Sequence, residues 1–208
     1  MKANNNFLLR IAFLLLAMLV LVVFIWVEYS EKNESPQQSA AEAALSVIHS
    51  RKSVRDFIPG RPVGEEDIMT IIKAGMAAPS GRDIRPWEIV VINDRAMLDS
   101  LAAALPHAKM LESAPLAFVV CGDTVRSAYW YLDCSAVVQN MLLAVEALGL
   151  GAVWTAAYPD EDRMNAVAES TGLPAHIRPL AVIPAGYPNG DFQQKDKFDE
   201  TKIHYNRW

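Results

Sequence analysis

The distribution of apolar residues divides the chain into an N-terminal stretch and a longer globular part. Residues 11–27 form an unbroken apolar run of 17 residues, and a polar stretch at 31–39 follows soon after it. Further along, apolar positions recur at helical spacing or in short continuous runs, separated by Pro, Gly and charged residues. This pattern predicts an N-terminal segment at 1–30, a linker at 31–39 and one globular domain at 40–208.

The globular part alternates between predicted helices and predicted strands. We expect helices at 40–49, 65–78, 94–104, 127–148 and 160–171, and strands at 87–93, 115–122, 151–155 and 179–183. The run at 115–122 is continuously apolar, which predicts a strand buried on both faces. The alternation as a whole favours a layered α+β or α/β domain.

The N-terminal apolar run predicts a transmembrane helix that serves as a membrane anchor. A helix rises about 1.5 Å per residue, so roughly 20 apolar residues are needed to cross a hydrocarbon core of about 30 Å. A cleaved signal peptide is the alternative, but its apolar region usually runs about 7–15 residues and ends at a small-residue cleavage site. Lys2 and Arg10 precede the run and Glu28 follows it. This charge asymmetry predicts a cytoplasmic N-terminus and a domain on the outer side of the membrane.

Composition narrows the classes of partner. The 208 residues carry a formal net charge of −5, and without residues 1–30 the charge is −6. An acidic domain argues against nucleic acid as a partner. Cys121 and Cys134 lie in apolar stretches, which favours buried free thiols over a disulfide. The four histidines are scattered without metal-ligand spacing, so we expect no metal site.

A basic cluster, Arg51-Lys52-Ser53-Val54-Arg55, lies between the helix predicted at 40–49 and the breaker Pro59-Gly60. Arginine offers a planar fork of donors, lysine a point charge and serine a short donor, a set that suits a compact, multiply charged anion. Alone, such a cluster is more typical of a solvated surface turn. The motifs that follow it in the chain therefore decide its interpretation.

Taken in order, those motifs resemble the nitroreductase family of FMN-dependent oxidoreductases. Each motif is weak alone, but the order and spacing are specific, and the resemblance extends over residues 45–208. The matching pieces are Arg51–Arg55, Ala78–Gly81 with Pro86-Trp87, Asp133–Asn140, Gly149–Trp154 with Tyr158-Pro159, and Gly186–Pro188 with the basic C-terminal arm.

The resemblance implies a nitroreductase-like layered α+β fold, with a central mixed sheet flanked by helices, and a homodimer with FMN at each end of the subunit interface. It also assigns residues to the cofactor by position. Arg51, Lys52, Ser53 and Arg55 would meet the phosphate, the ribityl chain and the pyrimidine edge. Pro79, Ser80 and Gly81 would come from the partner subunit against the isoalloxazine ring. The backbone of Trp154, Thr155 and Ala156 would lie near flavin N5. Lys195 would close on the phosphate, and Lys197 is a second candidate for this role. No catalytic side chain is then required, because the cofactor carries the chemistry.

Three positions depart from the motifs or stand out within them. Asp83 and Arg85 occupy the region where relatives often have Asn before Gln-Pro-Trp, which puts a ring contact by residue 83 in doubt. We expect Asp83 to pair with a nearby arginine or with a cation of a partner chain. Asp133 interrupts an otherwise apolar helix face. It is either an ion-paired acid at the wet end of the helix or a direct ligand contact.

The function that the resemblance implies is two-electron transfer from NAD(P)H, or from a partner donor, through FMN to a small acceptor such as a nitroaromatic or a quinone. Another FMN-dependent reaction, such as reductive dehalogenation, is possible within the same fold. A membrane-tethered flavin-binding module without turnover is the alternative from a different class. The sequence does not choose between NADH and NADPH.

Overall fold

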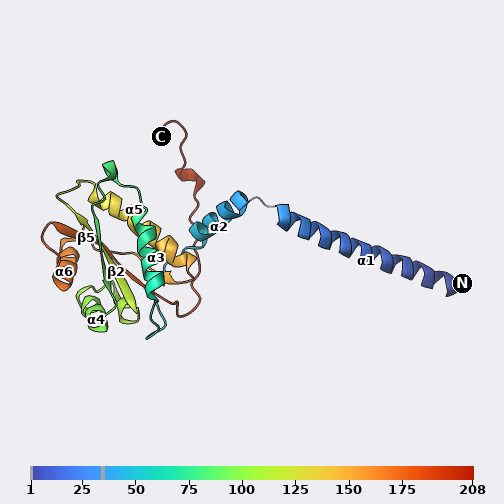
Figure 1. Cartoon of the computed structure of the whole chain (residues 1–208), viewed down its shortest axis with the longest axis horizontal. Helices are drawn as coiled ribbons and strands as arrows, with labels where there is room; N and C mark the ends of the chain where they lie inside the picture. The colour runs from blue at the N-terminus through green and yellow to red at the C-terminus, as the bar shows by residue number, and fades with distance from the viewer. Residues whose placement is uncertain (1, 34–35) are drawn as a thin grey trace. The chain divides into compact units, whose positions relative to one another are not determined.

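The computed structural model describes residues 2–33 and 36–208 and divides the chain into two compact units, Met1–Ser46 and Val47–Trp208 (Figure 1). The α-helices are α1 (Lys2–Asn33), α2 (Pro36–Ser50), α3 (Glu65–Met76), α4 (Arg95–Ala104), α5 (Trp130–Ala147) and α6 (Glu161–Thr171). The strands are β1 (Trp87–Ile92), β2 (Leu116–Asp123), β3 (Gly151–Ala152), β4 (Thr155–Ala156) and β5 (Ile177–Gly186), and three short 3₁₀ helices are η1 (Gly81–Asp83), η2 (Lys109–Glu112) and η3 (Glu200–Lys202).

The prediction of a transmembrane helix is wrong. Over the residues that the structure describes, none of the helices combines the length and the apolar character needed to cross a membrane. The apolar run at 11–27 rises only about 25 Å at 1.5 Å per residue, which is short of a hydrocarbon core of about 30 Å. The membrane location and the topology predicted from this helix are therefore wrong as well. The predicted linker at 31–39 falls on the end of α1, the start of α2, and residues 34–35, which lie outside the described residues.

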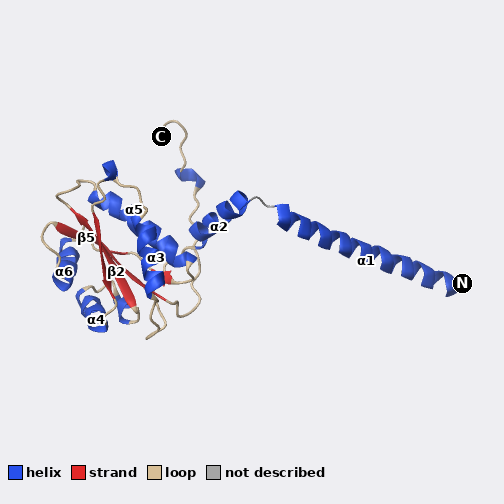
Figure 2. Cartoon of the chain, viewed as in Figure 1, coloured by secondary structure: helices blue, strands red, loops and turns tan. Residues whose placement is uncertain are grey.

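The second unit is built on a five-stranded sheet (Figure 2). The strand order is β1-β2-β5-β3, with β4 also pairing with β5, and all these pairs are antiparallel. In the described part of the chain, parallel pairing occurs at an isolated bridge between Ser53 and Ala152. The mixed character predicted for the sheet therefore comes from the basic segment at its edge.

One predicted strand, 151–155, is split into β3 and β4. Both pieces pair with β5, and the break falls opposite Pro184. The Val153 amide donates to the Pro184 carbonyl at 3.4 Å, but proline has no N–H with which to return the bond. The ladder is therefore interrupted at 153–154 and resumes at Thr155.

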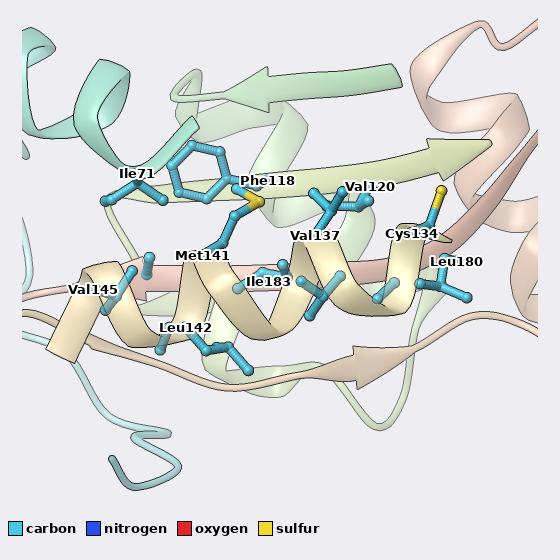
Figure 3. Close-up of a cluster of buried hydrophobic side chains, with 14 of the residues drawn as sticks. Ile71, Phe118, Val120, Cys134, Val137, Met141, Leu142, Val145, Leu180 and Ile183 are labelled. Atoms are coloured by element: carbon cyan, nitrogen blue, oxygen red, sulfur yellow. The ribbon is translucent and has the colours of Figure 1, made fainter. Parts of the chain in front are cut away.

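Strand β2 is buried on both faces, as its continuous apolar sequence predicts. Its alternate residues belong to two different hydrophobic clusters, because successive side chains of a strand point to opposite faces. Helices α3 and α5 cover one face, and α4 and α6 cover the other (Figure 1). Phe118 and Val120 face α5, where they meet side chains such as Val137 and Met141 (Figure 3). The prediction of a layered α+β domain is confirmed.

The two cysteines are free and buried, as predicted from their apolar surroundings. The Cys134 thiol donates to the Cys121 carbonyl at 3.2 Å. Burial raises the pKa of each thiol to about 12. Both thiols are therefore protonated near neutral pH and serve as packing groups, Cys134 in the cluster beneath α5 and Cys121 in the cluster on the opposite face of the sheet.

Candidate cofactor-binding site

The basic cluster is fixed to the edge of the sheet by two buried side chains. Val54 is 1% exposed and Phe57 is fully buried. The Val54 amide donates to the Ala152 carbonyl at 2.9 Å, and the Phe57 amide donates to Ser113 Oγ at 3.3 Å. Gly151 permits this approach, since a Cβ there would lie 2.7 Å from Val54. The segment is thus held as part of the folded domain, and the surface-turn interpretation does not describe it.

A cavity of about 500 Å³ opens beside this segment. Its walls come from two regions that are far apart in the sequence, namely the end of α2 with the basic cluster and the C-terminal arm. Five of the lining residues are cationic and one is acidic; the full lining set is Ile48, His49, Arg51, Lys52, Ser53, Arg55, Gln193, Gln194, Lys195, Asp196, Lys197 and Phe198. Such an excess of cations, together with hydroxyl and amide groups, fits a phosphorylated ligand.

One of the cations is already paired within the chain. Lys52 Nζ lies 3.0 Å from Glu146 Oε1, and the two side chains are 28% and 12% exposed. Glu146 lies in the last turn of α5, where it brings a negative charge to the C-terminal end of the helix. The pair holds the Lys52 side chain in one direction and neutralises part of its charge. Arg51 and Arg55, with the arm lysines, therefore supply most of the free positive charge at the cavity.

The predicted loop residues Pro79, Ser80 and Gly81 lie elsewhere and do not line this cavity. The loop instead meets Asp133 in the first turn of α5. Ser80 Oγ donates to one Asp133 carboxylate oxygen at 2.9 Å, and the Gly81 amide donates to the other at 3.1 Å. Asp133 is thus neither ion-paired in the described part of the chain nor a wall of the cavity. It anchors the loop, a role that sequence reasoning missed.

Asp83 and Arg85, the two residues that depart from the family motif, pair with each other. Arg85 forms a bidentate pair with Asp83, with both N···O distances at 2.6 Å. The hydrogen bond and charge of Arg85 lower the pKa of the Asp83 carboxyl, and Asp83 in turn raises the pKa of Arg85. The expected pairing of Asp83 with a nearby arginine is confirmed. The pair is exposed, so it contributes little to stability.

The third predicted group, Trp154, Thr155 and Ala156, spans the restart of the sheet at β4 and is also absent from the cavity wall. Trp154 packs against the main hydrophobic cluster, and Ala156 is exposed. Thr155 is half-buried, and its hydroxyl makes no hydrogen bond within the part of the chain that the structure describes. The structure therefore joins the basic cluster with Lys195 and Lys197 around one cavity. The other two predicted groups, residues 79–81 and 154–156, are not part of its wall.

Two acids hold candidate residues in place, and the sequence did not predict either role: Glu146 pairs with Lys52, and Asp133 binds Ser80 and Gly81. The partner of Lys52, Glu146, is 94 residues away in the chain, and nothing in the local sequence marks it. Asp133 left a clearer signal, because it is the one acid on the buried stripe of α5. A buried acid on an apolar helix face requires donors, and the Ser-Gly dipeptide at the end of a nearby loop can supply them.

A layered α+β domain that gathers cations around a cavity of about 500 Å³ has a site suited to a phosphorylated ligand. The family model for the nitroreductase family matches residues 48–109 and 99–187. A protein of Methanothermobacter thermautotrophicus, whose assigned name is NADH dehydrogenase/NAD(P)H nitroreductase, is 41% identical over 79% of this chain and 87% of its own length.

Solved structures agree with this match. A Bacteroides thetaiotaomicron protein with the same assigned name is 61% identical, with a TM-score of 0.78 over 80% of this chain and 98% of its own. An FMN-dependent nitroreductase from Clostridium difficile R20291 is 25% identical, with a TM-score of 0.74 over 79% of this chain and 99% of its own. The chain belongs to the nitroreductase family, and it is an oxidoreductase. The resemblance carried by the sequence motifs is confirmed.

Proposed function

We propose that this protein is an FMN-dependent NAD(P)H oxidoreductase that reduces a small acceptor such as a nitroaromatic or a quinone. The observation that carries the proposal is the cavity of about 500 Å³ walled by Arg51, Lys52, Ser53 and Arg55 on one side and by Lys195 and Lys197 on the other. The FMN dependence of the Clostridium difficile relative supports the choice of cofactor. The chemistry that FMN supplies when bound is two-electron transfer between a nicotinamide donor and the acceptor.

In this proposal, the cationic residues divide the work of holding the cofactor. A phosphate monoester carries between one and two negative charges near neutral pH, so it needs several cations or oriented donors. Arg51 and the arm lysines would neutralise the phosphate, and Ser53 would donate a short hydrogen bond. Arg55 would lie toward the pyrimidine edge, where a cation stabilises the negative charge that develops on reduction. Lys52, held by Glu146, would contribute less than its formal charge.

We further propose that the active form is a homodimer. The loop at Pro79–Gly81 lies outside the cavity of its own chain, so a contact between this loop and a bound cofactor requires the loop of a second copy. Exposed apolar side chains on the helices of one sheet face provide a surface for such a copy. Met69 and Met76 on α3 and Leu132 on α5 are 47%, 46% and 54% exposed, and a second copy packed on these helices would cover them.

The proposal is tested on the purified full chain. We expect it to be yellow, or to become yellow on adding FMN, and to oxidise NADH or NADPH when a nitroaromatic or a quinone is present. Comparing the two nicotinamides at equal concentration identifies the donor. A protein that takes up no FMN, or one that binds FMN but reduces none of these acceptors with either nicotinamide, contradicts the proposed function.

A further inference from the structure

The segment from Ser80 to Arg85 adopts an unusual backbone conformation. Arg82, Asp83 and Arg85 have φ values of 56°, 56° and 52°. This left-handed region is one that residues other than glycine seldom adopt, and such a run persists only where the surrounding structure holds it in place. All three residues are exposed, so burial of their side chains does not explain the conformation. Within the segment the Arg126 guanidinium donates to the Ile84 carbonyl at 2.7 Å, and further restraints act at the two ends.

A single carboxylate holds the first end. Asp133 is only 7% exposed, and it accepts hydrogen bonds from the Ser80 hydroxyl at 2.9 Å and from the Gly81 amide at 3.1 and 3.3 Å. Hydrogen bonds to an ionised acceptor are stronger than those between neutral groups. Its place in the first turn of α5 adds the favourable interaction of an acid with a helix N-terminus.

The same carboxylate reaches the second end through Ser80. While the Ser80 hydroxyl donates to Asp133, it accepts the Arg85 amide at 2.8 Å. The Ser80 hydroxyl oxygen therefore connects both ends of the loop from Ser80 to Arg85, in which Ile84 alone between Arg82 and Arg85 is right-handed, to α5. The exposed ion pair between Asp83 and Arg85 closes the run from outside, but it is screened by solvent.

We propose that Asp133 is a positioning residue that fixes the loop from Ser80 to Arg85 in the shape that it presents to the cofactor and the acceptor. This inference rests on the proposed function, which assigns Pro79, Ser80 and Gly81 to the face of the flavin in a second copy of the chain. Asp133 touches neither cofactor nor acceptor in this scheme. It acts through Ser80 and the backbone of Gly81.

The test compares Asp133→Asn and Asp133→Ala with Asp162→Asn in the full chain. Asp162 is an exposed acid in the first turn of α6, so its variant matches the helix position and the loss of charge. In the Asp133 variants we expect hydrogen–deuterium exchange at the amides of Gly81 and Arg85 to rise by about tenfold or more, since a charge-assisted hydrogen bond is lost. We expect no change at these amides in Asp162→Asn.

The kinetic readout separates positioning from general destabilisation. We expect the KM for the acceptor to rise by about fivefold or more in Asp133→Ala, with a smaller effect on kcat, because a loosened loop weakens binding first. Ser80→Ala should reproduce this rise in KM. Ser80→Thr keeps the hydroxyl, so its KM should lie closer to that of the unmodified protein. If Asp133→Ala does not fold, the two Ser80 variants decide the question.

The outcomes keep this inference apart from the proposed function. Unchanged exchange at Gly81 and Arg85 in Asp133→Asn, or fully additive effects of Asp133→Ala and Ser80→Ala, overturns the positioning role. Failure of the unmodified protein to take up FMN overturns the proposed function instead. In that case the exchange experiment, which needs no cofactor, still shows whether Asp133 fixes the loop.

Discussion

Replacing Gly151 with alanine perturbs the connection between the sheet and the basic cluster. A Cβ at residue 151 would lie 2.7 Å from Cβ, Cγ1 and Cγ2 of Val54, closer than real carbon atoms approach. Val54 is buried and cannot rotate its Cβ away, so its backbone must shift. The shift weakens the bond from the Val54 amide to the Ala152 carbonyl and moves Ser53 and Arg55 with it.

The size of the effect follows from packing. Inserting a methyl group into a filled site costs about 1–3 kcal/mol of unfolding free energy. Val54→Ala alone removes two buried methyl groups, which costs about 2 kcal/mol when transfer at roughly 0.8 kcal/mol per group is combined with the cavity term. In the double variant the close contacts with Cγ1 and Cγ2 are gone, and the contact with the Cβ of residue 54 is the one that remains. We therefore expect the double variant to lose at least about 1 kcal/mol less than the sum of the single losses.

Two measurements check this prediction on the full chain. Urea unfolding followed by tryptophan fluorescence reports on the domain core, because Trp87 and Trp130 are buried in it. FMN titration should show about tenfold weaker binding in Gly151→Ala and partial recovery in the double variant, as expected if about 1.4 kcal/mol of binding depends on the position of the cluster. Gly64→Ala is the control, since a Cβ there meets only Asp67 Oδ2 at 4.0 Å. Additive losses of stability, or an unchanged FMN affinity in Gly151→Ala, would refute the reasoning.

Two further predictions concern charge. Glu146→Gln releases the Lys52 ammonium from its partner, so FMN should bind a few times more tightly while unfolding free energy falls by about 1 kcal/mol; weaker FMN binding would show that Glu146 serves mainly to orient Lys52. The pKa values of Cys121 and Cys134, raised to about 12 by burial, mean that the folded state keeps protons that the unfolded state releases above about pH 9. The free energy of unfolding should therefore fall as pH rises from about 9 to 12, by about 1.4 kcal/mol per pH unit per thiol. The slope of this free energy against pH, measured by urea unfolding, should flatten in the variant with both Cys121→Ala and Cys134→Ala. A slope in that variant equal to the slope in the unmodified protein would show that the two thiols do not cause the loss of stability.

Much of the layered fold could be predicted because its signals are local. The continuous apolar run at 115–122 became the fully buried strand β2, and the helices predicted at 65–78 and 160–171 differ from α3 and α6 by only one or two residues at an end. The predicted strand 151–155 was less reliable, since its interruption depends on Pro184 in a different strand. A pattern read along one segment carries no information about the partner of that segment.

The candidate site shows the same limit. The sequence marked Arg51 to Arg55 as an anion-binding segment, and the structure joins it to Lys195 and Lys197 around one cavity. It could not mark Glu146, because an ion pair between residues 94 positions apart leaves no local pattern. The membrane prediction failed for a different reason. A run of 17 apolar residues lies near the minimum length for a membrane span, and hydropathy alone does not separate a helix that spans from one that does not.

The central claim is that the cationic cavity holds the phosphate of FMN. It is tested most directly by titrating the full chain with FMN and with riboflavin, which has the same ring but no phosphate, and by repeating both titrations with the double variant Arg51→Ala and Arg55→Ala. Charge-assisted hydrogen bonds contribute about 1.5–3 kcal/mol each, so we expect the unmodified protein to prefer FMN by about 100-fold or more and the variant to lose most of that preference. Equal affinity for FMN and riboflavin in the unmodified protein would contradict the claim.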